Sequence, residues 1–216
     1  GIDLVVFREN TEDLYSVVEF NTVPDRLRDA LAELSPPLKA FKDLPGDQYA
    51  ISCKVNTKQG SERIIRAAFE FAQKFGRKKV TVVHKANVVR ATDGLFLETA
   101  KQVAKDFPGI AMDDANIDAM TMWLLKNPFN YDVLVAPNLY GDIISDLCAQ
   151  MVGGLGFGCS GNIGEKLAVF EPTHGSAPKY AGQYKVNPIA TILAARGLSG
   201  AGPVCVCECE CVTRTG

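Results

Sequence analysis

The chain alternates short apolar runs with longer segments of helical periodicity, and this pattern restricts its possible folds more than any other feature. Apolar runs of this length are typical of strands buried within a sheet. We expect strands at residues 2–7, 49–55, 79–84, 131–136 and 167–170. The second of these strands is expected because its polar and apolar residues alternate.

The longer segments place apolar residues on one side of a helix. Residues 59–75 are the clearest case, with Ile64, Ile65, Ala68 and Phe71 forming one stripe. We expect helices at residues 59–75, 92–106, 117–126 and 143–151, and the start of a helix at residues 188–195. Strands that alternate with helices predict a layered α/β architecture.

A proline-rich, charged segment at residues 22–46 interrupts the alternation. It is too long for an ordinary connection between two elements. Part of it, residues 25–34, has a helical pattern. We expect either a subdomain or an arm that packs on another subunit.

Composition excludes two classes of partner. The net charge is −2 and the basic residues form no stripe, so no nucleic-acid surface is expected. No apolar run approaches the roughly 18 residues needed to cross a membrane. With 216 residues, the chain is long enough for one large domain or one and a half.

The two ends of the sequence are unusual. The chain begins at Gly1 directly in a strand-like run, so we expect an internal fragment whose targeting information and compartment cannot be read. Near the other end, Cys205, Cys207, Cys209 and Cys211 alternate with other residues. This tail could be a thiolate metal clip, an exposed strand or translated non-coding sequence, and we favour the last. Three further cysteines, Cys53, Cys148 and Cys159, occur singly in apolar contexts that indicate buried thiols.

Asp142 and Asp146 are four residues apart in the segment NLYGDIISD. If a helix begins after a turn at Tyr140-Gly141, both carboxylates lie on one helix face, where their repulsion favours a bound cation. Together with Asp118 they would offer oxygen ligands suited to Mg²⁺ or Mn²⁺. The alternative is a solvated helix start that needs no metal.

Three other segments carry candidate polar groups. Arg8 ends an apolar strand and could clamp a carboxylate, with Tyr15 nearby as a proton donor; the alternative is a structural ion pair of Arg8 with Glu9 or Glu12. Lys85 follows a strand and could have a lowered pKa, or it could be an ordinary loop lysine.

The third segment, FEPTHGSAPKYAG at residues 170–182, contains the small residues of a loop that a ligand approaches closely. His174 could stack on a heteroaromatic ring, and Lys179 and Tyr180 could reach a phosphate. No G-x-G-x-x-G follows a strand, so a Rossmann fingerprint is absent from the sequence.

Taken together, RENTEDLY, HKAN, NLYGDIISD and THGSAPKYAG resemble the isocitrate and isopropylmalate dehydrogenase family of β-decarboxylating dehydrogenases. The resemblance runs from about residue 1 to residue 195. RENTEDLY is similar to the isocitrate and homoisocitrate branches, whereas the isopropylmalate branch typically has RELTGG.

The resemblance implies an incomplete isopropylmalate dehydrogenase-like fold, with a small domain and part of the large domain. Its expected parts are a strand with a catalytic loop, a clasp-like insertion, a small α/β domain with the metal site, a cofactor-binding segment and the anomalous tail. Their bounds are residues 1–21, 22–46, 47–166, 167–196 and 197–216.

The resemblance also assigns roles to residues. Arg8 would bind a substrate carboxylate, Tyr15 would be the general acid, and Lys85 would assist proton transfer at the hydroxyl. Asp118, Asp142 and Asp146 would hold Mg²⁺ or Mn²⁺. The cofactor would be contacted by His174, Gly175, Ser176, Ala177, Lys179, Tyr180 and Asn187.

The function implied is oxidative decarboxylation of isocitrate to 2-oxoglutarate, a tricarboxylic acid cycle reaction, with reduction of NADP. Lys179-Tyr180 resembles NADP-using members, whereas NAD-using relatives usually have Asp-Ile there. The alternatives are an NAD-dependent homoisocitrate or 3-isopropylmalate dehydrogenase and a non-catalytic regulatory subunit. A homodimer with shared active sites is implied, and the fragment alone is expected to be inactive.

Overall fold

The computed structural model describes residues 1–164, 166–198 and 210–215, and its main element is a seven-stranded mixed sheet. The strand order is β5-β4-β6-β1-β9-β7-β8. The strands are β1 (Leu4–Glu9), β4 (Lys79–His84), β5 (Ala111–Asn116), β6 (Val133–Ala136), β7 (Cys159–Ile163), β8 (Ala168–Pro172) and β9 (Glu210–Thr215). The first four strands in this order are parallel, whereas β9 runs antiparallel to both β1 and β7.

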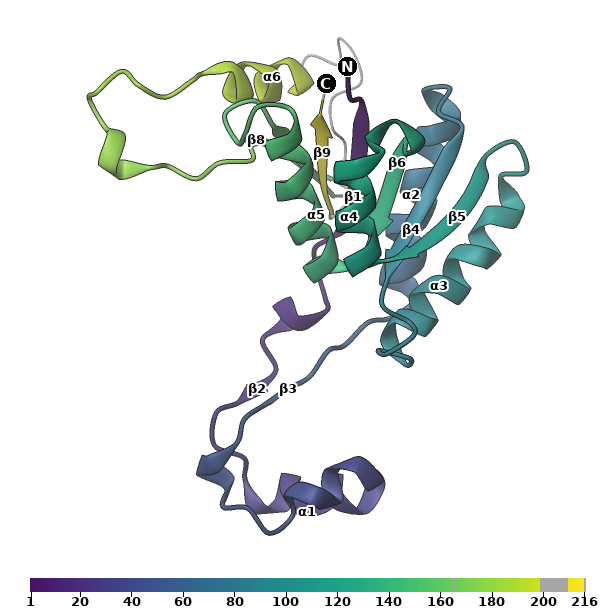
Figure 1. Ribbon diagram of the computed structural model, residues 1–216, viewed down its shortest axis with the longest axis vertical. Coiled ribbons are helices and arrows are strands. Elements are labelled where there is room, and N and C mark those ends of the chain that lie inside the picture. The colour runs from purple at the N-terminus through teal and green to yellow at the C-terminus, as the bar shows by residue number, and fades with distance from the viewer. Residues whose placement is uncertain (165, 199–209, 216) are drawn as a thin grey trace.

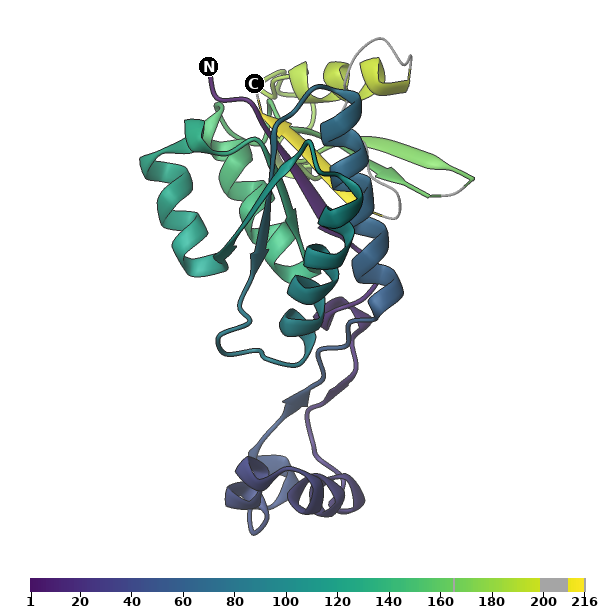
Figure 2. The ribbon, with the colours of Figure 1, turned by 90° about the vertical axis from the view of Figure 1, so that its right-hand side faces the viewer.

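Helices cover both faces of the parallel part of the sheet (Figures 1 and 2). Helices α2 (Lys58–Lys74) and α3 (Thr92–Val103) lie on one face, and α4 (Ile117–Lys126) and α5 (Asn138–Met151) lie on the other. Helix α6 (Ile189–Leu198) packs beside β7 and β8. The layered α/β fold expected from the sequence is therefore confirmed.

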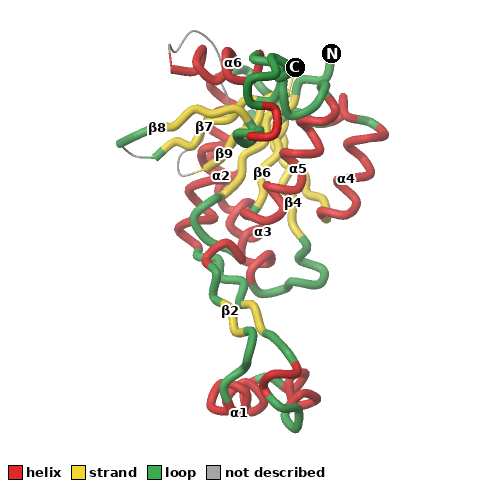
Figure 3. Tube along the Cα trace, turned by 90° about the vertical axis from the view of Figure 1, so that its left-hand side faces the viewer, coloured by secondary structure: helices red, strands yellow, loops and turns green. Residues whose placement is uncertain are grey.

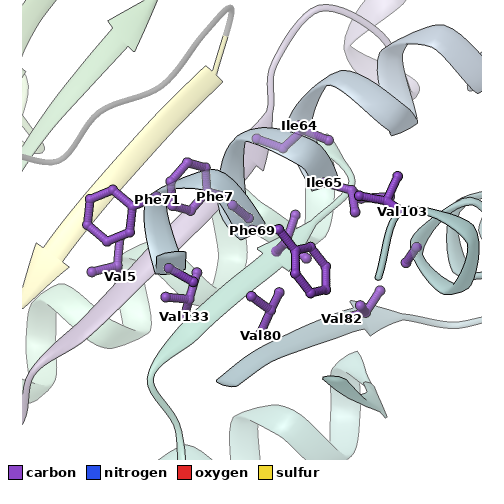
Figure 4. Packing of buried hydrophobic residues seen from close by; sticks show 14 of the residues in the cluster. Val5, Phe7, Ile64, Ile65, Phe69, Phe71, Val80, Val82, Val103 and Val133 are labelled. Carbon is purple, nitrogen blue, oxygen red and sulfur yellow. The ribbon is translucent and has the colours of Figure 1, made fainter. Parts of the chain in front are cut away.

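Strand β1 shows why the central strands are apolar throughout. Val5 and Phe7 belong to the core under α2 and α3, which Figure 4 shows from close by. Leu4 and Val6 belong to the core under α4 and α5. Because successive side chains of a strand point to opposite faces, a strand covered on both sides needs apolar residues at every position.

An arm projects from this body (Figures 1 and 3). It consists of a ribbon of β2 (Glu19–Phe20) and β3 (Ile51–Ser52), followed outward by α1 (Asp25–Leu34) and a 3-10 helix at Pro36–Phe41. The helix expected at residues 25–34 is present, but only Ile51 and Ser52 of the strand expected at 49–55 form a strand. The segment from 22 to 46 is thus an excursion from the core.

Three sequence expectations were wrong in detail. Strands β5 and β7 were not anticipated, because half of the residues of β5 are polar and the strand is partly exposed, and β7 contains Gly161. Helix α5 begins at Asn138, so Tyr140-Gly141 lies within the helix and is not a turn. Strand β1 continues to Glu9, so Arg8 lies inside the strand.

Cysteine burial agrees with expectation at two of the three single positions. Cys148 and Cys159 are buried, but Cys53, on the arm, is partly exposed. Cys205, Cys207 and Cys209 lie outside the described residues. The tail residues that are described form β9 between β1 and β7, which is an interior position of the sheet and not an exposed edge. That the tail derives from non-coding sequence stays a prediction.

The part of the chain that the structure describes contains no candidate for a membrane-spanning helix. None of its helices combines the length and the apolar character needed to span a bilayer.

Candidate functional site

Polar side chains gather along the edge where the parallel strands end. Arg8 lies near the end of β1, Lys85 directly follows β4, Asp118 follows β5, and Asn138 opens the helix after β6. In open α/β sheets, ligands bind outside the carboxyl ends of the strands. The topology therefore brings segments that are distant in sequence to the edge where a site is expected.

Arg8 and Tyr15 bind the two oxygens of one carboxylate. Arg8 Nη1 donates to Asp142 Oδ1 over 2.5 Å, and Tyr15 Oη donates to Asp142 Oδ2 over 2.6 Å. Arg8 also donates from Nε and Nη2 to Asn138 Oδ1, over 2.9 and 2.8 Å. The hydrogen bond to Asp142 raises the pKa of Tyr15, and burial adds to the effect, so its hydroxyl stays protonated at neutral pH.

The alternative interpretation, an ion pair of Arg8 with Glu9 or Glu12, was wrong. Glu9 is fully buried and accepts from Arg63 Nη2 over 3.1 Å. Glu12 accepts from the backbone and hydroxyl of Thr57. Tyr15 is 46% exposed, so it is not a core tyrosine.

Asp142 and Asp146 face a cleft of about 290 Å³. Arg8 also lines this cleft, as do His174 and Gly175 from the opposite segment. Burial raises the pKa of Asp146 and the charge of Asp142 raises it further, while Arg8 opposes the shift. Two carboxylates that repel each other beside a cleft suit a divalent cation, which would relieve the repulsion.

Asp118 lies apart from these two aspartates. Its Oδ1 accepts from Lys85 Nζ over 2.5 Å, and this hydrogen bond lowers the pKa of Asp118. Among residues 1–164 and 166–196, no group of three His, Cys, Asp or Glu side chains could hold a metal ion. Within one chain, therefore, Asp142 with Asp146 and Lys85 with Asp118 form two separate clusters. A gathering across a twofold axis stays a prediction.

The proposed cofactor loop reaches the cleft through His174 and Gly175. His174 Nδ1 lies 2.8 Å from Gly175 O, which makes Nδ1 the donor, and His174 Nε2 is buried with no hydrogen-bond partner. Ser176 and Ala177 continue the loop, and Ala177 has a positive φ of 42°.

The remaining predicted cofactor residues lie farther along the same segment. Lys179 Nζ lies 4.9 Å from the ring centroid of Tyr180, and Tyr180 is 40% exposed. Asn187 Oδ1 accepts from the backbone N–H of Ile189 at the start of α6. None of these three side chains lines the cleft that Arg8 shares with His174.

Sequence reasoning missed several residues of the site, among them Asn138 and Glu171. Asn138 fixes the Arg8 guanidinium, and Glu171 lines the cleft. Asn138 lies four residues before Asp142, the same helical spacing that singled out Asp146, so this spacing could have identified it. Glu171 stands in the stretch FEPTHG without any comparable signal.

Together, the sheet and its edge define an α/β protein with guanidinium, phenol and carboxylate groups at the carboxyl ends of parallel strands. The chain belongs to the isocitrate/isopropylmalate dehydrogenase family, which it matches over residues 1–199.

Among its relatives is a 3-isopropylmalate dehydrogenase of Archaeoglobus fulgidus, 46% identical over 195 residues, or 90% of this chain and 52% of the relative. A probable mitochondrial NAD isocitrate dehydrogenase subunit alpha of Caenorhabditis elegans is 44% identical over 195 residues, covering 90% and 48%. The crystal structure of isocitrate dehydrogenase from Methylococcus capsulatus matches with a TM-score of 0.77 at 44% identity, covering 92% of this chain and 53% of that one. Other relatives are named homoisocitrate dehydrogenase and NAD isocitrate dehydrogenase regulatory subunit.

The chain spans about half the length of the curated relatives it matches. The names of these relatives differ in substrate.

Proposed function

We propose that this chain is the substrate- and metal-binding portion of a dehydrogenase that oxidatively decarboxylates isocitrate to 2-oxoglutarate and reduces NADP. One observation carries the proposal. Arg8 and Tyr15 bind the two oxygens of Asp142 beside a cleft that is also lined by Asp146 and His174. A carboxylate clamp, a proton donor and two oxygen ligands thus adjoin the cofactor loop.

Each group has a role that fits its surroundings. The guanidinium of Arg8 suits a substrate carboxylate, because its planar donors match carboxylate geometry. Tyr15 stays protonated at neutral pH and can donate a proton to the carbanion left when CO₂ departs. Lys85 would assist the transfer of the proton from the substrate hydroxyl.

Asp142 and Asp146, with Asp118, would hold Mg²⁺ or Mn²⁺, in keeping with their oxygen donors. When bound, the cation supplies a Lewis acid that polarises the oxygen of the substrate. Arg8 and Tyr15 orient Asp142 beside the cleft, because each binds one of its oxygens.

A homodimer with shared sites is part of the proposal. Lys85 and Asp118 lie apart from Asp142 and Asp146, so a second copy has to supply them if all four groups act together. Exposed apolar side chains on and after α4 support a contact there, with Met122, Leu125 and Phe129 exposed by 53%, 66% and 77%. The arm exposes Leu34 and Phe41 and offers a second contact. A relative named as a regulatory subunit favours a heteromer as the alternative assembly.

NADP is proposed over NAD because of Lys179 and Tyr180. A lysine ammonium beside a phenol can bind the extra phosphate of NADP, and neither group would repel it. Relatives named as NAD isocitrate dehydrogenases make NAD the alternative. NAD-dependent oxidation of homoisocitrate or 3-isopropylmalate is the alternative reaction, in view of the names of other relatives.

The test is an assay of the full-length protein that contains this chain. Isocitrate, homoisocitrate and 3-isopropylmalate are each supplied with NADP or NAD, with Mn²⁺ or with a chelator. We expect reduction of NADP with isocitrate, dependent on Mn²⁺ and lost in Asp142→Asn. Asp106→Asn, which alters an exposed ion pair with Arg66, is the control and should be active. Turnover of another substrate, or none in the presence of Mn²⁺, would overturn the proposal.

A further inference from the structure

A buried ion cluster lies between the two groups of candidate catalytic residues. It consists of Lys54, Asp13 and Asp93. Lys54 Nζ lies 2.6 Å from Asp93 Oδ1 and 3.4 Å from Asp13 Oδ2. Both aspartate side chains are fully buried, and the Lys54 side chain is only 14% exposed. A single ammonium therefore neutralises part of the charge of two buried carboxylates.

Backbone N–H groups also bind both carboxylates. Asp13 Oδ1 accepts from the N–H of Leu14, and Asp13 Oδ2 accepts from that of Leu139, over 2.7 and 3.3 Å. Asp93 Oδ2 accepts from the N–H of Lys85 over 2.6 Å. Hydrogen bonds of this kind stabilise the charged form of a buried carboxylate.

These three N–H groups belong to the segments that carry the candidate site. Leu14 begins the short helix Leu14–Ser16, which contains Tyr15. Leu139 lies in the first turn of α5, three residues before Asp142. The third N–H is that of Lys85 itself. The cluster therefore contacts the backbone beside the proton donor, beside a metal ligand and at the candidate base.

The position of Lys54 also ties the cluster to the arm. Lys54 follows β3, and its neighbour Val55 accepts from the N–H of Asp13 over 2.8 Å. Asp13 has a φ of 73°, a conformation that is uncommon for a residue other than glycine. The hydrogen bond from its N–H to Val55 and the three contacts of its carboxylate hold Asp13 in this conformation.

We propose that Lys54 is a positioning residue that sets the backbone of Tyr15 and of Lys85 through Asp13 and Asp93. The proposal deepens the proposed function and rests on it. Lys54 lines neither the cleft nor the Lys85–Asp118 pair, and besides the two carboxylates its Nζ lies 4.5 Å from the ring centroid of Tyr140. Its effect on the site is therefore indirect. If each active site of a dimer is built from both subunits, Tyr15 and Lys85 of one chain belong to different sites. Lys54 then positions one group in each site.

The experiment combines kinetics with hydrogen exchange in the full-length protein. Lys54→Met removes the charge and retains most of the volume. Lys79→Met is the matched control, because Lys79 also pairs with an aspartate, Asp113, but this pair lies outside the cluster. We expect Lys54→Met to lower kcat by roughly tenfold to a hundredfold, with the KM for the nicotinamide cofactor within about twofold of its usual value.

The amide hydrogens of Leu14 and Lys85 are expected to exchange at least about tenfold faster in Lys54→Met, while those of β4 stay protected. Lys79→Met should change neither measurement. Unchanged kcat, or unchanged protection of both amides, would overturn the proposal. If Lys54→Met does not fold, Asp93→Asn takes its place, and the exchange rate of the Lys85 amide hydrogen decides.

The two proposals fail separately. Absence of turnover in the unsubstituted protein refutes the proposed function, and the exchange of Leu14 and Lys85 still decides whether Lys54 positions their backbone.

Discussion

A Cβ atom placed on Gly141 would lie 2.5 Å from Cγ of Arg8. Helix α5 therefore approaches β1 so closely that only glycine fits at this position. The close approach lets Arg8 pass along the helix and reach both Asn138 and Asp142. The glycine of NLYGDIISD is explained by this packing and not by a turn.

Gly141→Ala is expected to destabilise the protein by about 1–3 kcal/mol, because the added methyl group overlaps Arg8. It should also lower activity, since Arg8 must move away from Asp142. Gly94→Ala in α3 is the control, as nothing lies within 4 Å of the place its new methyl group would occupy, and alanine is favoured in a helix by about 1 kcal/mol. Chemical denaturation of both variants gives the comparison, and equal stability would contradict the packing argument.

Glu9 is expected to be important for folding and not for chemistry. Its buried carboxylate accepts from the N–H groups of Thr11 and Glu12 and from Arg63. Glu9→Ala removes the acceptor of the Thr11 and Glu12 N–H groups and should cost about 2–4 kcal/mol in free energy of unfolding. Glu98→Ala removes an exposed partner of Lys101 and should change the stability by less than about 1 kcal/mol. A small effect at Glu9 would show that water replaces the lost acceptor.

Shared active sites predict complementation between two inactive variants. Tyr15→Phe and Lys85→Met each remove one proton-transfer group from every site of a homodimer. In a mixed dimer, one site regains both groups, so random mixing should restore about one quarter of the unsubstituted activity. Tyr131→Phe should be active in every combination. No recovery after verified subunit exchange would place both groups of a site in one chain.

Cys148 is expected to resist alkylation and to make stability depend on alkaline pH. Burial raises the pKa of its thiol to about 12. The folded state then keeps this proton when the unfolded chain loses it, near a pKa of about 8.5, so stability should fall as the pH rises from about 8.5 toward 12.

Unfolding at a series of pH values should show a smaller decrease in Cys148→Ala than in the unsubstituted protein. At pH 9, iodoacetamide should modify the partly exposed Cys53 and leave Cys148 intact. Rapid modification of Cys148 in the folded protein would refute its burial.

The 216-residue chain alone is expected to show no measurable turnover of isocitrate. The substrate carries about three negative charges at neutral pH, and Arg8 is the one Arg or Lys among the described residues that line the cleft. A coupled assay at high protein concentration is the measurement. Robust NADP reduction by this polypeptide would show that Arg8 and His174 suffice.

The alternation of apolar runs and helical stripes was enough to predict the layered architecture. Most central elements follow from it, because a strand buried on both faces must be apolar and a covering helix needs a stripe. Strand β5 escaped prediction since three of its six residues, AMDDAN, are polar, and pairing with β4 makes it a strand. The motif residues Arg8, Tyr15 and Asp142 were identified one by one, each from its own segment.

The sequence by itself thus determined the layers, the family resemblance and the candidate residues, because these depend on local periodicity and on short motifs. Only the tertiary structure decided which residues meet: Arg8 with Asp142 and not with Glu9, Lys85 with Asp118, and Lys54 with two buried aspartates. Such pairings join positions up to 134 residues apart. They depend on strand order and on the close packing of helices, which no local pattern contains.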